Sequence, residues 1–174
     1  MNEWWLRTAL VLQAPRAVFV ALRDDSPEAA AERAEPVLLI VLLSGISVAL
    51  SSNAASGYDG LLLAVWAFLA GAITGIAAYW AFGAILFWSA RLLGSRGSYR
   101  RARHVLAYAS VPLALSIVLL PTGRHAFSWL VLPFAAWSAA LLVTGVRAVH
   151  GWSWPRAAAT AVVPVAAAVG LLAL

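Results

Sequence analysis

The basic residues of this chain alternate with its apolar segments, and this alternation predicts how the chain crosses a membrane. All twelve basic residues are arginine. Eleven of them lie in alternate gaps between the apolar segments, and the other gaps hold only Arg124. An arginine near the end of a membrane-spanning helix resists translocation, so the arginine-rich gaps are expected on the cytoplasmic side. The clustered residues are Arg7, Arg16, Arg23 and Arg33, then Arg91, Arg96, Arg100, Arg101 and Arg103, and then Arg147 and Arg156.

The composition is typical of an integral membrane protein. Apolar residues make up 63% of the chain, and the mean hydropathy is +0.87. A net charge of +5 in a soluble protein would suggest nucleic acid, but arginines beside spans indicate phospholipid headgroups instead. The lack of cysteine excludes disulfides, thiolate metal sites and thiol nucleophiles. Arginine without lysine and abundant alanine favour a bacterial protein, which we expect in the cytoplasmic (inner) membrane.

We predict an all-α fold, a bundle of five transmembrane helices preceded by an N-terminal interfacial amphipathic helix. Residues 1–35 are expected to form a cytoplasmic amphipathic segment, with two short pieces that meet at Pro15 and a capped polar helix at 27–35. Residues 36–174 are expected to form the transmembrane domain, with the N-terminus inside and the C-terminus outside. The predicted spans are 36–52, 60–93, 104–121, 126–146 and 156–174.

The segment 60–93 is expected to be one long helix. It would measure about 50 Å, against about 30 Å for the hydrocarbon core of a bilayer. Splitting it in two would need a turn, and the segment contains no proline, asparagine or aspartate. Gly71 and Gly75 form a GxxxG pair, extended by Gly83, that allows another helix to approach closely. Packing within the chain is favoured over dimerisation.

The sequence disfavours an enzyme. No acidic residue, arginine or histidine lies at mid-depth in a predicted span, whereas proton relays and ion-coupled transporters need such residues. The chain has no His-Glu-x-x-His motif and no phosphate-binding glycine loop. His104, His125 and His150 lie at span ends and only two of them share a side, so we expect no metal site and no cofactor.

Two arginine-bearing loops are the candidate contact sites. In the first, Gly94 and Gly97 end one helix and Ser98 can cap the next. The arginines that follow either anchor the topology or bind lipid phosphate or an acidic partner. The second loop follows the fourth predicted span. The candidate lipid- or partner-binding residues in the two loops are Arg96, Arg100, Arg101, Arg103, Arg147, His150 and Arg156.

These loops resemble the Yip family, the Ypt/Rab-interacting membrane proteins with five spans. The first loop shows the Gly-Ser-Tyr turn followed by an Arg-Val-x-x-Tyr-x-x-x-Pro helix, with His104 inserted after the arginine. Pro15 and Phe19 near the N-terminus are similar as well. The matching residues in the two loops and the spans beside them are Arg103, Val105, Tyr108 and Pro112, and then Trp137, Gly145, Arg147, His150, Gly151, Arg156 and Ala157.

The resemblance implies a five-span membrane protein, and the bacterial members that it resembles have no settled activity. Eukaryotic members are associated with Rab GTPases, vesicle formation and membrane shaping, and they carry a longer cytosolic N-terminal region. This chain has only residues 1–35 there, and a bacterial host has no prenylated Rab, so we expect no Rab-type GTPase partner.

The leading interpretation is a non-enzymatic membrane protein that organises, shapes or scaffolds the membrane through lipid and protein contacts. Anionic headgroups are the expected lipid partners, and nucleic acid is not expected. A protein partner and a homo-oligomer are both compatible with the sequence. The alternatives are a lipid-handling transporter such as a scramblase, or an accessory subunit of a larger membrane complex.

Overall fold

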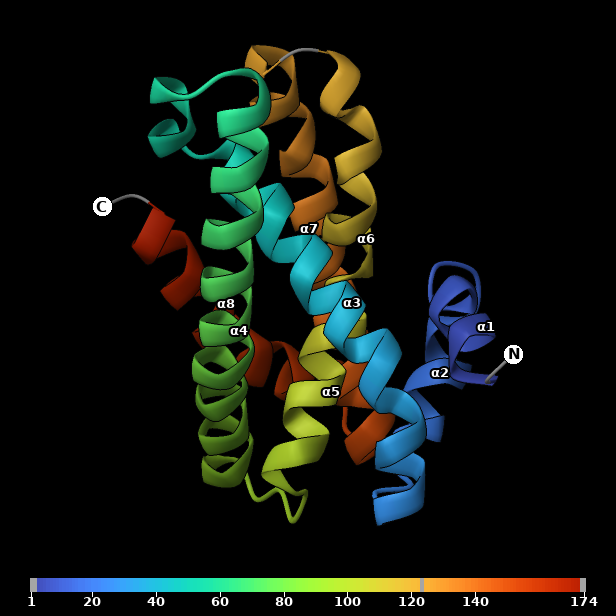
Figure 1. The fold of residues 1–174 in the computed structure, drawn as a ribbon. Coiled ribbons are helices and arrows are strands. Elements are labelled where there is room, and N and C mark those ends of the chain that lie inside the picture. Colours follow the sequence, from blue (N-terminus) through green and yellow to red (C-terminus); the bar gives the residue numbers. More distant parts are fainter. Residues whose placement is uncertain (1–2, 123, 173–174) are drawn as a thin grey trace.

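The structure is a computed structural model that describes residues 3–122 and 124–172, and throughout this part of the chain the regular elements are helical (Figure 1). Two short helices precede the bundle, and the longest helix, α4, stands beside α3. The elements in chain order are α1 (Glu3–Leu10), α2 (Pro15–Ala21), α3 (Pro27–Ser51), η1 (Asn53–Gly57), α4 (Gly60–Leu92), α5 (Tyr99–Ala109), α6 (Val111–Leu115), η2 (Ser116–Thr122), α7 (Arg124–His150) and α8 (Trp154–Leu172).

Three helices of the described residues are long and apolar enough to cross a membrane, namely Pro27–Ser51, Gly60–Leu92 and His125–His150. The pair Tyr99–Ala109 and Val111–Pro121, which bends by 41°, makes a fourth if it is one span. The prediction of an all-helical membrane protein is thereby confirmed, whereas the count of five spans stays a prediction. The last helix, α8, packs on α4 and α7 and runs obliquely across the bundle (Figure 1).

The prediction of a separate helix at 27–35 is wrong, because α3 runs without a break from Pro27 to Ser51. Ser26 caps this helix, since its hydroxyl accepts a hydrogen bond from the Ala29 N–H at 3.2 Å. Pro36 cannot donate its backbone hydrogen bond, but it is fully buried and lies beside the buried Val37 and Ile40. Tertiary packing therefore keeps the helix intact through the proline.

The helix is interrupted in the third predicted span. α5 ends at Ala109, and Pro112 lies in the first turn of α6, where its missing N–H costs little. The chain then continues as the 3-10 helix η2. α5 also begins at Tyr99, earlier than the expected 104, because the Ser98 hydroxyl accepts from the Arg101 N–H at 3.0 Å.

α3 and α4 touch along glycines, with backbone against backbone. A Cβ added at Gly71 would lie 2.5 Å from the Cα of Ile46, and one at Gly75 would lie 2.6 Å from the carbonyl oxygen of Val41. On the opposite helix, Gly45 faces the Gly71 carbonyl and the Gly75 Cα. These glycines let two spans pack within one chain more closely than side chains would allow.

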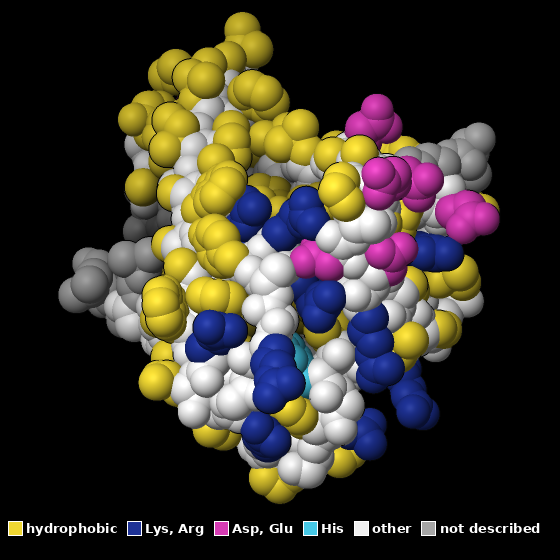
Figure 2. Space-filling model, turned by 90° about the horizontal axis from the view of Figure 1, so that it is seen from below, with side chains coloured by type: hydrophobic (Ala, Val, Ile, Leu, Met, Phe, Trp, Pro, Cys, Tyr) yellow, Lys and Arg dark blue, Asp and Glu magenta, His cyan; other side chains and the backbone are white. Residues whose placement is uncertain are grey.

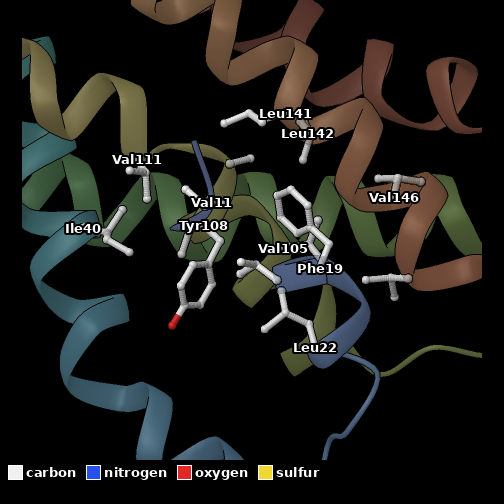
Figure 3. Close-up of a cluster of buried hydrophobic side chains, with 14 of the residues drawn as sticks. Val11, Phe19, Leu22, Ile40, Val105, Tyr108, Val111, Leu141, Leu142 and Val146 are labelled. Carbon is white, nitrogen blue, oxygen red and sulfur yellow. The ribbon is translucent and has the colours of Figure 1, made fainter. Parts of the chain in front are cut away.

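The main hydrophobic core includes the N-terminal helices (Figure 3). Val11, Phe19 and Leu22 are 0% exposed and lie among side chains of α5 and α7 such as Val105 and Val146. α1 adds Trp4, whose ring lies 5.7 Å from that of Tyr108. Amphipathic periodicity shows that these helices have an apolar face, but it does not show whether that face meets lipid or protein. Here much of it packs against the bundle.

Candidate lipid and partner interface

One end of the molecule carries a concentration of arginine side chains. Figure 2, which views the molecule from below, shows basic side chains spread over this face, with acidic side chains grouped to one side. The ends of α4 and α7, the starts of α3 and α5, and the residue 93–98 loop meet here. Segments that are distant in sequence thus assemble one charged surface, called here the basic end.

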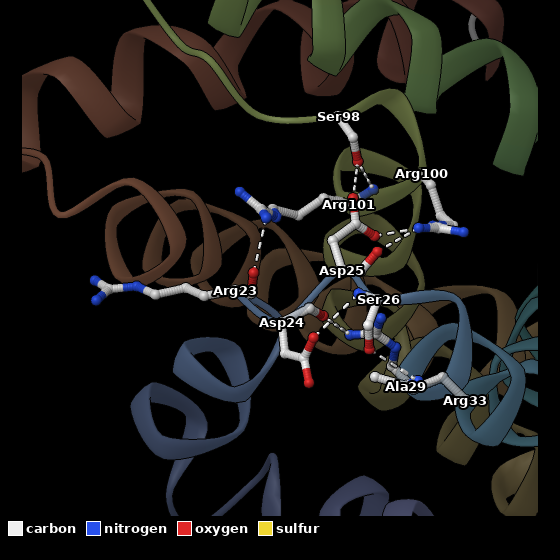
Figure 4. Close-up of polar contacts among 9 residues, drawn as sticks. All are labelled: Arg23, Asp24, Asp25, Ser26, Ala29, Arg33, Ser98, Arg100 and Arg101. Atoms are coloured by element: carbon white, nitrogen blue, oxygen red, sulfur yellow. Dashed lines mark hydrogen bonds and ion pairs between the residues drawn. The ribbon is translucent and has the colours of Figure 1, made fainter.

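Asp25 is the acidic centre of the basic end (Figure 4). Its carboxylate accepts hydrogen bonds from Arg100 Nε at 2.9 Å and from the Ser98 hydroxyl, while Arg100 Nη2 donates to the Asp25 backbone carbonyl. Burial acts to raise the pKa of Asp25, but the hydrogen bonds from Ser98 and Arg100 outweigh it, so the pKa is lowered. This ion pair fastens the linker between α2 and α3 to the start of α5.

Arginines also bind the carbonyls of this linker. Arg101 Nη2 donates to the Arg23 carbonyl at 2.7 Å, and Arg33 Nη1 donates to the Asp24 carbonyl at 2.8 Å. The Arg23 side chain in turn donates to the Ala148 carbonyl near the end of α7, at 2.6 and 3.1 Å. A cation is favourable at that helix terminus. Arg100 and Arg101, two candidate lipid-binding residues, therefore hold the N-terminal segment in place.

Arg33 is the deepest charge at this end, with a side chain that is 1% exposed. Its guanidinium lies 5.0 Å from the ring centroid of Trp4, in addition to its bond to the Asp24 carbonyl. A buried cation is tolerated only with such partners. α1 and the linker therefore both stabilise the charge on α3.

Arg147, His150 and Arg156 form a second group, where α7 turns into α8. Arg147 lies 4.4 Å from the ring of Trp154, Arg156 lies 4.2 Å from that of Trp152, and the ring of His150 stacks on Trp152 at 4.4 Å. Arg156 Nη2 donates to the Leu93 carbonyl just after α4. His150 Nε2 lies 2.8 Å from the Ser95 hydroxyl, and His150 Nδ1 lies 3.0 Å from the Val146 carbonyl.

The space beside His150 is small. A cavity of about 10 Å³ lies between the 95–98 loop, α5 and α7, lined by Ser95, Arg101 and His150 together with apolar side chains. This is about the volume that one water molecule requires. A lipid headgroup does not fit behind His150, so any headgroup contact must be on the outer surface.

Arg103 reaches a different surface, the outer side of α4. Its guanidinium lies 3.6 Å from the ring centroid of Trp80, 4.7 Å from that of Tyr99 and 5.1 Å from that of Tyr79. The side chain crosses α4 at Gly83, where an added Cβ would collide with the Arg103 Cγ. Gly83 thus makes room for an arginine, whereas Gly71 and Gly75 make room for a helix.

The remaining candidate, Arg96, lies exposed on the loop after α4, and it makes no contact within the described part of the chain that would hold it in place. The structure thus divides the candidates into the linker-binding Arg100 and Arg101, the ring-stacked Arg103, Arg147, His150 and Arg156, and the exposed Arg96.

Sequence reasoning missed Asp25, Arg33 and Trp4. Asp24 and Asp25 are the only two acidic residues that are adjacent in the sequence, and this pair is the signal that could have indicated a partner for the arginines. Nothing in the local sequence of Trp4 or Arg33 indicates that they approach each other.

Comparison with known proteins agrees with this architecture. The family model of the Yip1 domain matches residues 9–174. No curated protein and no solved structure gives a match. The Yip1 match includes both arginine-bearing loops and nearly the whole helical bundle, and the chain therefore belongs to the Yip family of membrane proteins.

Proposed function

We propose that this protein is a non-enzymatic membrane organiser of the Yip type, which acts through lipid and protein contacts at the cytoplasmic side of a bacterial inner membrane. In this proposal the N-terminus and the basic end face the cytoplasm, and the C-terminus is outside. The main observation in support is that several guanidinium groups of the basic end lie over indole rings. The pairs are Arg103 with Trp80, Arg147 with Trp154 and Arg156 with Trp152.

Stacked pairs of this kind suit the headgroup region of a bilayer. Indole rings prefer the boundary between hydrocarbon and water, and guanidinium groups match the geometry of phosphate. A guanidinium stacked on an indole keeps its outward N–H groups available, because the ring covers only its face. The basic end can therefore present oriented cations at the depth of lipid phosphates.

The polar groups of the basic end serve structure rather than chemistry in this proposal. The Asp25 carboxylate is paired with Arg100. His150 Nδ1 can only donate to the Val146 carbonyl, so Nε2 accepts from the Ser95 hydroxyl, but the cavity of about 10 Å³ beside this pair leaves no room for a substrate. These contacts support a role without catalysis.

The alternative of a lipid-handling transporter would need a polar path along a lipid-facing helix. Several serine and threonine hydroxyls of the helices instead donate to carbonyls of their own helix. Ser44 bonds to the Val41 carbonyl at 3.1 Å, and Ser110 bonds to the Leu106 carbonyl at 2.9 Å. The same holds for Thr74, Ser89, Thr144 and Thr160. These bonds favour the organiser over the transporter.

The test is the lipid composition around the protein. Polymer nanodiscs cut from a membrane that contains phosphatidylglycerol and phosphatidylethanolamine would carry the protein with its nearest lipids. We expect phosphatidylglycerol to be enriched relative to the bulk membrane, and less so for the variant with Arg147→Gln and Arg156→Gln. A bulk-like composition around the wild-type protein contradicts the proposal. Rapid headgroup exchange by the protein in liposomes would favour the transporter instead.

A further inference from the structure

Arg103 differs from most other arginines of the basic end in what it binds. Arg23, Arg33, Arg101 and Arg156 donate to backbone carbonyls, and Arg100 pairs with Asp25. Within the described residues, Arg103 has three aromatic rings around it but no hydrogen-bond acceptor, and its Nε is buried among them. The N–H groups of the Arg103 guanidinium therefore have no acceptor among the described residues, as is also true of Arg147, which lies beside the Trp154 ring.

The rings hold the guanidinium in a defined orientation. Tyr99 at the start of α5 donates its hydroxyl to the Trp80 carbonyl on α4 at 2.8 Å, and the two rings lie 5.9 Å apart. The Trp80 ring is the closest to the guanidinium, at 3.6 Å. An arginine stacked in this way loses little further freedom when it binds an anion, because its plane is already set.

The site faces lipid rather than the interior of the bundle. Trp80 is 50% exposed, and the turns of α4 before it expose Leu69, Ile73 and Ile76 at 55%, 69% and 45%. Trp80 follows Gly60 by twenty residues, about 30 Å along the helix, which matches the thickness of the hydrocarbon core. Acyl chains would therefore lie along α4, and a headgroup at their end would lie beside Arg103.

We propose that Arg103, held by Trp80, Tyr99 and Tyr79, binds the phosphate of one membrane phospholipid, whose acyl chains lie along the exposed face of α4. This inference rests on the proposed function and adds to it a defined lipid site. The ligand is an anionic phosphodiester in the leaflet that faces the basic end. Gly83 is part of the site, because the Arg103 side chain can cross α4 only where no Cβ stands.

Native mass spectrometry of the full chain with phosphatidylglycerol added from detergent measures this binding. We expect Arg103→Gln to weaken retention of the first bound lipid at least about ten-fold, as for loss of hydrogen bonds to a charged group. Gly83→Ala keeps every charge and ring but displaces the side chain, and it should weaken retention similarly. Trp80→Leu should do so without touching the core, because Trp80 is half exposed.

Arg91→Gln is the matched control. Arg91 lies exposed on the same helix and carries the same charge, 5.7 Å from the Phe87 ring. Its loss should weaken retention by about five-fold or less, the effect of one surface charge. If Arg91→Gln weakens retention as much as Arg103→Gln, the specific site is refuted while general headgroup attraction still stands.

Two further measurements test whether the bound phosphate belongs to a lipid and whether the variants are still folded. Glycerol phosphate, which has the headgroup chemistry without acyl chains, should not displace the bound lipid, and displacement at millimolar concentration would refute a lipid site. Unchanged retention in Gly83→Ala, with an unchanged melting temperature, would likewise overturn the proposal. If the wild-type chain retains no phosphatidylglycerol, the proposed function fails as well.

Discussion

The contact between α3 and α4 makes a quantitative prediction about Gly71. In Gly71→Ala the new Cβ would lie 2.5 Å from the Cα and 2.6 Å from the N of Ile46, about 1 Å short of ordinary contact. Both atoms are backbone, so no side chain can rotate away, and the two helices must separate. Overpacking of this kind typically destabilises a protein by about 1–3 kcal/mol. We expect a loss within this range, reduced by the better helix propensity of alanine.

The matched control is Gly170→Ala in α8, where an added Cβ meets nothing within 4 Å. The same substitution there should leave stability unchanged or raise it by up to about 1 kcal/mol. Unfolding in mixed micelles with increasing dodecyl sulfate, followed by circular dichroism, would give the two free energies of unfolding. If Gly71→Ala is as stable as Gly170→Ala, the close glycine contact does not hold these helices together, and the argument is refuted.

The remaining predictions concern the N-terminal segment, the charge network and the topology. Phe19→Ala removes a fully buried ring, so it should cost about 3–5 kcal/mol and make the first 26 residues sensitive to protease, whereas Val20→Ala, which is 38% exposed, should change little. The pKa of Asp25 is lowered from its usual 3.8, so its contribution to stability is present above that value and is lost as the pH falls through the lower folded-state pKa. The melting temperature should therefore fall more steeply in acid for the wild type than for Asp25→Asn, and parallel pH profiles would contradict this. A cytoplasmic reporter should be active at Gly97 and a periplasmic reporter after Leu174; the reverse would overturn the proposed orientation.

The sequence predicted the long helices well, because their signals are long and local. The apolar run without turn residues correctly indicated that α4 is one helix, and the arginine clusters marked residues that the structure gathers at one end. The prediction that a helix ends at Pro36 was wrong, because packing around Val37 and Ile40 outweighs the loss of one backbone hydrogen bond.

The site was predictable only as a set of residue types. The order of the arginines along the chain does not reveal that Arg100 pairs with Asp25 across 75 positions, or that Arg103 turns toward Trp80. The roles of the individual arginines depend on which carbonyl or ring lies nearby after folding. Gly83 illustrates this, since its spacing from Gly75 suggested helix packing but its neighbour is an arginine side chain.

The long-range bonds of the linker constrain the order in which the protein can assemble. α1 and α2 are synthesised first, but the linker that follows them is held by Arg100 and Arg101 and by the Ala148 carbonyl, which emerge 75 to 125 residues later. Until α7 is made, Phe19 on α2 lacks the helix that it packs against at Gly145. Domains are synthesised at about 5–20 residues per second, so this interval lasts several seconds or more. During it, the apolar face of α2 is free to rest on the membrane surface.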